Sequence, residues 1–240
     1  MEIKINAIVL KAVDYKDNDR ILTLYSLENG KITAGIKGVK KAGAKLKFAS
    51  EPFCFAEYIL NCKNGKYTVI GATYIDTFYE LRLNLEKYYT SAIISDFLLN
   101  YTENEMPDTA LFSLAINSIK DICYNGYEKL SLAKFLYSGV SLLGYSIINT
   151  NCSYCDESIS GRVFFRFKDA SFSCLECKED GYTEIRKETY GIIKSLQNGN
   201  FDTESQYKDI DKGLRFLFYY IELKTDTKLK SIESYEKTMQ

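Results

Sequence analysis

The chain has 240 residues, 46% of them hydrophobic, and a formal net charge of -1, which are the values of an ordinary globular protein with a substantial core. It contains no histidine, which excludes serine or cysteine nucleophiles activated by histidine and every histidine-ligated metal site. The charge is uneven: residues 1–80 carry twelve Lys or Arg against nine Asp or Glu, a net of +3, whereas residues 81–181 carry nine against thirteen.

The N-terminal third of the chain predicts a small β-barrel. Alternating apolar residues indicate five strands: 3–11, 20–27, 31–36, 53–62 and 67–76. Asn29-Gly30 and Asn64-Gly65 each stand between two of these runs, and Asn-Gly is favoured where both central residues of a hairpin turn have positive φ. Five short strands with a long connection after the third predict a barrel of the oligonucleotide-binding (OB) type, with an SH3-like barrel as the alternative.

That long connection is strongly basic. Between Glu28 and Glu51, a stretch that also includes the third strand, there are six lysines and no acidic residue, and Gly35, Gly38 and Gly43 interrupt it. A flexible cationic segment on a barrel suits binding along a phosphate backbone, although such segments are also common as plain solvated surface. Phe48, Phe53, Phe55, Tyr58 and Tyr67 are aromatic candidates for base stacking, but their strand pattern favours core positions.

From Leu81 the apolar period changes to about 3.6, which predicts helices. One stripe runs from Leu111 to Ile122 with Pro107 just inside the helix start, and a second runs from Leu132 to Leu143 and stops at Gly144. A third stripe, from Ile210 to Ile221, lies near the C-terminus. These stripes predict one helical domain.

Four cysteines between the helical stretches form two pairs, Cys152-x-x-Cys155 and Cys174-x-x-Cys177, with 18 residues between the pairs. This spacing is typical of a tetrahedral zinc site, and four thiolates fill the coordination shell, so one structural zinc ion is predicted. The alternative, two disulfides, suits neither the odd cysteine count nor a chain whose start lacks a secretory signal pattern and which we expect to be cytoplasmic.

Three classes of function remain open on the residues alone. The first is a DNA-binding protein, the second is a zinc-stabilised adaptor that binds only proteins, and the third is a metal-dependent nuclease. The nuclease would use Asp14, Asp17 and Asp19 as magnesium ligands, but a turn between strands explains these residues better.

The order of these parts resembles the RecO family of bacterial DNA repair proteins. The N-terminal similarity lies in Ile8-Val9-Leu10-Lys11, the run from Asp17 to Ser26, Gly30-Lys31, the run from Lys37 to Lys41, and Glu51-Pro52-Phe53. It continues in Leu143-Gly144-Tyr145, the four cysteines and Leu229-Lys230-Ser231, and so covers nearly the whole chain.

The resemblance implies a non-enzymatic recombination mediator at the bacterial nucleoid. Such a protein binds single- and double-stranded DNA, anneals complementary strands, and works with RecR to load RecA onto DNA coated by single-stranded-DNA-binding protein (SSB). The acidic, hydrophobic C-terminal tail of SSB would bind an apolar pocket of the helical domain, for which Lys120, Lys129 and Lys134 are candidates by location. The implied DNA-binding residues are Arg20, Lys31, Lys37, Lys40, Lys41, Lys45 and Lys47.

We therefore expect an α+β protein: an OB-type antiparallel barrel followed by a helical domain with an inserted four-cysteine zinc element. The expected boundaries are the barrel at 1–79, the first helical part at 80–150, the zinc element at 151–181 and the second helical part at 182–240.

Overall fold

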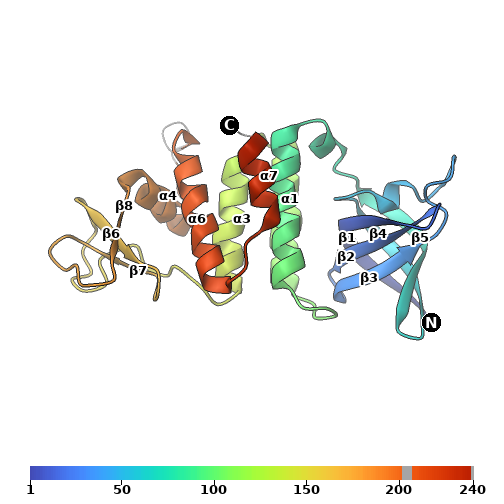
Figure 1. The fold of residues 1–240 in the computed structure, drawn as a ribbon, viewed down its shortest axis with the longest axis horizontal. Helices are drawn as coiled ribbons and strands as arrows, with labels where there is room; N and C mark the ends of the chain where they lie inside the picture. Colours follow the sequence, from blue (N-terminus) through green and yellow to red (C-terminus); the bar gives the residue numbers. More distant parts are fainter. Residues whose placement is uncertain (202–206, 239–240) are drawn as a thin grey trace.

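A computed structural model describes residues 1–201 and 207–238 of the chain. It confirms the predicted α+β class, with a closed five-stranded barrel, a set of helices and a four-cysteine element. The barrel stands at one end of the molecule, the helices form the middle, and a small three-stranded sheet forms the other end (Figure 1). No helix in the described ranges is both long and apolar enough to cross a membrane.

The barrel strands follow the predicted runs closely. The strands are β1 (Glu2–Tyr15), β2 (Asp19–Ser26), β3 (Gly30–Ile36), β4 (Phe55–Lys63) and β5 (Lys66–Asp76). Their order around the barrel is β1-β2-β3-β5-β4, and every neighbouring pair is antiparallel except β3 and β5, which close the barrel in parallel. Inside the barrel the alternate residues of all strands form a closed apolar core that includes Leu22, Ala34 and Val69.

The two Asn-Gly turns differ. Asn64 and Gly65 both have positive φ, 52° and 70°, as predicted for a tight hairpin. At the other turn only Gly30 has positive φ, so the prediction for Asn29 is wrong. Ser26 pairs with Gly30 across a loop of three residues, and the Ser26 hydroxyl accepts a hydrogen bond from the Asn29 amide. This is the geometry of a three-residue loop closed by a left-handed glycine.

The helical part consists of helices that carry the three predicted stripes, together with others. In chain order they are η2 (Tyr79–Arg82), α1 (Leu85–Tyr101), α2 (Thr109–Tyr124), α3 (Glu128–Leu142), α4 (Lys187–Asn198), α6 (Ile210–Thr225) and α7 (Lys230–Thr238). Asp108 caps α2 by accepting a hydrogen bond from the Leu111 amide, so Pro107 precedes the helix and does not lie inside its first turn. Gly144, with φ of +89°, follows the last residues of α3 as predicted.

The barrel joins the helices through the outer face of β1 and β2. Residues 7–10 of β1 are all buried, because Ala7 and Val9 face the barrel core while Ile8 and Leu10 face the helices. Tyr25 of β2 packs its ring near Phe112 of α2, with centroids 5.9 Å apart. The helix-facing residues belong to one continuous core that extends through the helical layer to the small sheet.

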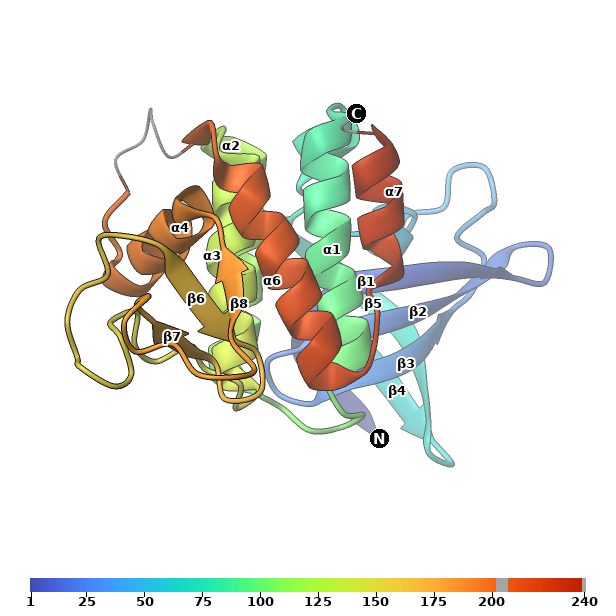
Figure 2. The ribbon, with the colours of Figure 1, turned by 60° about the vertical axis from the view of Figure 1, so that its left-hand side comes forward.

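The small sheet contains β6 (Val163–Arg166), β7 (Ser171–Ser173) and β8 (Thr183–Ile185), in the order β7-β6-β8. Phe165 of β6 contacts Phe216 and Tyr220 of α6, and Phe172 of β7 contacts Tyr190 of α4. This element is therefore packed into the helical core and is not a free appendage. Figure 2 shows the sheet lying against α4 and α6.

The backbone of Met106 lies close to Gly30, and this contact allows a test of how firmly the barrel is joined to the helices. A Cβ atom at Gly30 would lie 2.2 Å from the carbonyl oxygen of Met106, whereas a Cβ at Gly65, which also has positive φ, would meet nothing within 4 Å. We expect Gly65→Ala to lower the free energy of unfolding by about 1 kcal/mol, the cost of left-handed backbone alone.

Gly30→Ala adds a clash between the barrel and the α1–α2 connection, and we expect it to cost about 3 kcal/mol or more in urea unfolding. Equal losses for the two variants would show that the barrel can move away from Met106 freely.

Candidate DNA-binding surface and metal centre

The four cysteines converge. The Sγ atoms of Cys152, Cys155, Cys174 and Cys177 all lie within 4.8 Å of one another, and they form the one such group of potential metal ligands among residues 1–201 and 207–238. Sulfur atoms around a tetrahedral zinc ion lie about 3.8 Å apart, given zinc–sulfur bonds of about 2.3 Å, so a small contraction would complete the site. The donor set therefore fits a closed metal centre with no position left for water.

Local backbone contacts bring the two cysteine pairs together. The Cys152 carbonyl accepts a hydrogen bond from the Asp156 amide, which closes the first turn, and the Ser153 amide donates to the Phe172 carbonyl of β7. Cys174 directly follows β7, so the same strand that anchors the first pair begins the second. Between the two pairs the chain forms a short hairpin of β6 and β7, which brings them together.

The pKa values of Cys152 and Cys177 are shifted in opposite directions. Burial opposes ionisation of Cys152, but the backbone N–H groups of Cys155, Cys174 and Tyr154 outweigh it and lower the pKa of the Cys152 thiol to about 6. A hydrogen bond with Cys174 raises the pKa of Cys177 to about 12. A divalent cation at the centre would remove this difference, because it stabilises the thiolate form of each ligand.

The basic connection between β3 and β4 is folded, which differs from the flexible segment expected from its glycines. The amides of Lys41, Ala44 and Lys47 donate in succession to the carbonyls of Gly38, Lys41 and Ala44. Val39 is buried in the barrel core, and Leu46 packs against that core. These anchors hold the chain while its lysines point outward.

The predicted DNA-binding residues fall into two groups. Lys37, Lys41, Lys45 and Lys47 are exposed and have no ion pair among the described residues. Lys40 is exposed but its Nζ lies 2.7 Å from Asp14 Oδ2. The light-blue connection that carries these lysines lies at the end of the barrel away from the helices (Figures 1 and 2).

Arg20 and Lys31 are engaged within the protein. The Arg20 guanidinium lies 3.0 Å from Asp14 and 2.9 Å from Glu51, and it donates to Ser50, so it ties β2 to the end of the basic connection. Lys31 Nζ donates to the carbonyls of Leu99 and Thr102 at 2.7 and 2.6 Å. Burial lowers the pKa of this ammonium group, yet the free carbonyls at the end of α1 are the natural partners of a cation.

The three aspartates weighed as magnesium ligands do not converge with one another into a group of metal ligands within the described part of the chain. Asp14 accepts hydrogen bonds from Lys40 and Arg20, which hold the pKa of its carboxyl below the usual value, and Asp19 accepts from the Gly38 amide. These carboxylates organise the turn and the start of the basic connection.

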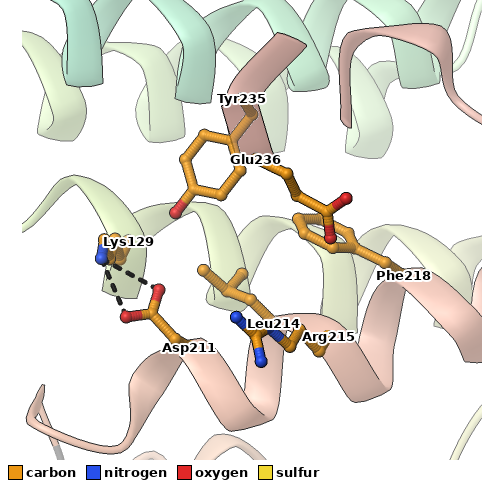
Figure 3. A pocket seen from close by; sticks show the side chains of 7 residues that line it. All are labelled: Lys129, Asp211, Leu214, Arg215, Phe218, Tyr235 and Glu236. Atoms are coloured by element: carbon orange, nitrogen blue, oxygen red, sulfur yellow. Dashed lines mark hydrogen bonds and ion pairs between the residues drawn. The ribbon is translucent and has the colours of Figure 1, made fainter. Parts of the chain in front are cut away.

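A cavity of about 310 Å³ lies between α3, α6 and α7. Figure 3 shows its lining, in which Lys129 forms a 2.9 Å ion pair with Asp211. The buried Tyr235 hydroxyl points into the cavity and has no hydrogen-bond partner among the described residues. The full lining is Lys129, Asp211, Leu214, Arg215, Phe218, Tyr235 and Glu236.

Of the lysines considered by location, Lys129 lines this cavity, whereas Lys120 and Lys134 do not. Lys134 lies over the ring of Phe201. Arg215 and Tyr235 were missed in the sequence, where Leu214 and Phe218 belong to an ordinary core stripe. In the sequence Arg215 is a cation directly after a residue of that stripe, and this pattern is too common to predict a binding site.

Comparison with known proteins places the chain in a family. The family model for the recombination protein O N terminal domain matches residues 1–78, and the model for the C terminal domain matches residues 82–233. Proteins named DNA repair protein RecO are similar over most of their length. That of Desulforamulus reducens is 29% identical over 96% of this chain and 92% of its own, and that of Pelotomaculum thermopropionicum is 31% identical over 81% and 77%. The chain therefore belongs to the RecO family of DNA repair and recombination proteins.

Proposed function

We propose that this protein is a non-enzymatic recombination mediator that binds single- and double-stranded DNA and anneals complementary strands. With RecR as partner, it would help to load RecA onto single-stranded DNA coated by SSB, at the bacterial nucleoid. The observation that carries the proposal is the exposed lysine row on the barrel, from Lys37 to Lys47, at the end of the molecule that the helices leave open. RecR and RecA are proposed as partners on the basis of family membership alone.

The electrostatics support a nucleic-acid surface despite the nearly neutral chain. The connection has no acidic residue between Glu28 and Glu51, and the chain's surplus of acidic residues lies beyond residue 80. Lysines exposed without carboxylate partners remain available to replace the counterions of phosphates. We infer that Lys37, Lys41, Lys45 and Lys47 make the principal contacts and that Lys40 joins them. Arg20 and Lys31 would then support this surface from within.

Two features support a role without catalysis. A centre with four thiolate ligands has no open position for substrate or water. The carboxylates of Asp14 and Asp19 are already used by Arg20, Lys40 and the Gly38 amide, so they offer no magnesium site of the nuclease type.

We further propose that the cysteine centre holds one structural Zn²⁺. The proposed working division of the chain is a DNA-binding barrel at 1–79, helical parts at 80–150 and 182–240, and the zinc element at 151–181. Because Phe165 and Phe172 of that element pack against α4 and α6, the metal would brace the helical core and not only the small sheet.

Cys174→Ser should release the metal and destabilise the protein. We expect less than a tenth of the wild-type zinc content by elemental analysis after gel filtration, and a free energy of unfolding lower by roughly 3 kcal/mol or more. Cys62→Ser, on β4 and outside the cluster, is the control and should keep its zinc. Retention of full zinc content and stability by Cys174→Ser would refute the proposed centre.

The lysine row should set the salt dependence of DNA binding. Replacing Lys37, Lys41 and Lys45 by glutamine removes three phosphate contacts, so the slope of log affinity against log salt for single-stranded DNA should become shallower by about 2. Annealing of complementary strands should slow in parallel.

The matched control replaces the exposed residues Lys187, Lys208 and Lys230, which removes the same total charge elsewhere. An unchanged slope in the first variant would remove the lysine row from the interface. If neither the wild-type protein nor the control variant bound DNA while both bound SSB, the adaptor alternative would replace the proposal.

The cavity between α3, α6 and α7 is our proposed site for the acidic, hydrophobic SSB tail. Leu214 and Phe218 supply an apolar floor, while Arg215 is exposed and has no ion pair within the described residues. The unpartnered Tyr235 hydroxyl could donate to the terminal carboxylate of such a peptide.

Arg215→Gln should weaken binding of a fluorescent peptide with the SSB tail sequence by about tenfold, since one charge-assisted contact is lost. Tyr235→Phe should weaken it less, and Lys120→Gln, on the exposed face of α2, should not change it. Fluorescence anisotropy at constant salt measures all three. Equal affinity of the Arg215 variant and the wild type would place the tail elsewhere.

A further inference from the structure

The outer face of the barrel carries a hollow that the lysine row does not explain. Across β2, β3 and β5, Ile21 stands opposite Gly35, and Gly35 stands opposite Thr68. Their neighbours in sequence, among them Leu22 and Ala34, fill the barrel core, so this row of residues faces outward. A Cβ built on Gly35 would meet nothing within 4 Å, and the missing side chain leaves a depression in the sheet. The cavity above it has a volume of about 440 Å³.

Two hairpin turns form the walls of this hollow. Tyr15, the last residue of β1, is 48% exposed. Tyr67, near the start of β5, is half-buried: it packs against the barrel core, and its remaining surface lines the hollow. Aromatic rings beside an apolar depression offer stacking surfaces for a planar heterocycle. Ile21 and the outer surface of β3 complete the apolar part of the lining.

The rim of the hollow is cationic. Lys37 and Lys66 line it together with Arg20, and the acidic residue in the lining, Asp19, already accepts a hydrogen bond from the Gly38 amide. A second, more polar hollow of about 380 Å³ adjoins it and shares Asp19 and Lys37. It adds Lys16, Lys41 and Asp17, so three ammonium groups and two carboxylates line it. An apolar, aromatic space therefore lies next to a group of ammonium groups, with Lys37 between the two.

This juxtaposition matches the two halves of a nucleotide. We propose that the hollow over Gly35 seats one unpaired base of single-stranded DNA, walled by Tyr15 and Tyr67, while Lys16, Lys37 and Lys41 bind the adjoining phosphate. The inference rests on the DNA-binding function proposed above and adds a means of discrimination. A base stacked inside a duplex cannot enter the hollow without leaving its partner, so the hollow favours single strands, whereas the lysine row serves both forms of DNA.

The test compares two ligands with equal phosphate charge. A thymidine oligonucleotide and an abasic oligonucleotide of the same length present the same backbone, and only the first presents bases. We expect the wild-type protein to bind the thymidine strand about tenfold more tightly, because stacking adds to the phosphate contacts. Fluorescence anisotropy at fixed salt measures both affinities.

Gly35→Val fills the hollow while leaving every charge in place. Gly35 has no left-handed backbone angle, so a β-branched residue suits its strand position. The variant should lose the preference for thymidine and keep its affinity for the abasic strand and for duplex DNA. Tyr67→Leu should act in the same direction, and Tyr67→Phe, which keeps the ring, should not. Thr73→Val, at an exposed position of β5 outside the hollow, controls for the added bulk.

The outcomes separate the two claims. Equal binding of thymidine and abasic strands by the wild type would overturn the base site and leave the lysine surface intact, as would an unchanged preference in both Gly35→Val and Tyr67→Leu. Absence of binding to any DNA would overturn the proposed function together with this inference.

Discussion

The contact between the outer face of β1 and β2 and the helical layer governs the rest of the molecule. The side chains of Ile8, Leu10 and Tyr25 point out of the barrel and pack in the helical core. This side of the barrel is therefore covered and cannot bind a ligand. Lys31 reinforces the contact by donating to the last carbonyls of α1, and Gly30 allows β3 to approach Met106 closely. The opposite face, across β2, β3 and β5, is left open, and the basic connection borders it.

The barrel and the helical layer differ in charge and in the sites that they expose. The barrel carries the basic connection, while the helical layer is acidic on balance and contributes a cavity with an apolar floor, bordered by Lys129, Asp211, Arg215 and Glu236. A phosphate chain and an acidic peptide would thus bind different parts of the protein. Because the cysteine element is packed on α4 and α6, its metal would stabilise the part that receives the peptide and not the part that receives DNA.

The exposed lysines depend on neutral anchors for their position. Val39 is buried in the barrel core, and Asp19 holds the Gly38 amide, so the connection is folded before any ligand arrives. A surface ordered in advance loses less conformational entropy on binding than a flexible one. Arg20, which joins Asp14, Ser50 and Glu51, contributes to this order from beneath.

The sequence alone determined the features that depend on local spacing: five strands, the helical stripes and the four convergent cysteines, because periodicity and knuckle spacing act over a few residues. It could not assign Lys31, whose partners lie 68 and 71 residues away at the C-terminal end of α1, nor reveal the hollow over Gly35, which three strands form together. The cavity holding Arg215 and Tyr235 likewise exists only where three helices meet. Contacts between residues far apart in the sequence decide which cations lack an ion pair and at which glycine the missing side chain leaves a hollow. No local sequence pattern encodes these contacts.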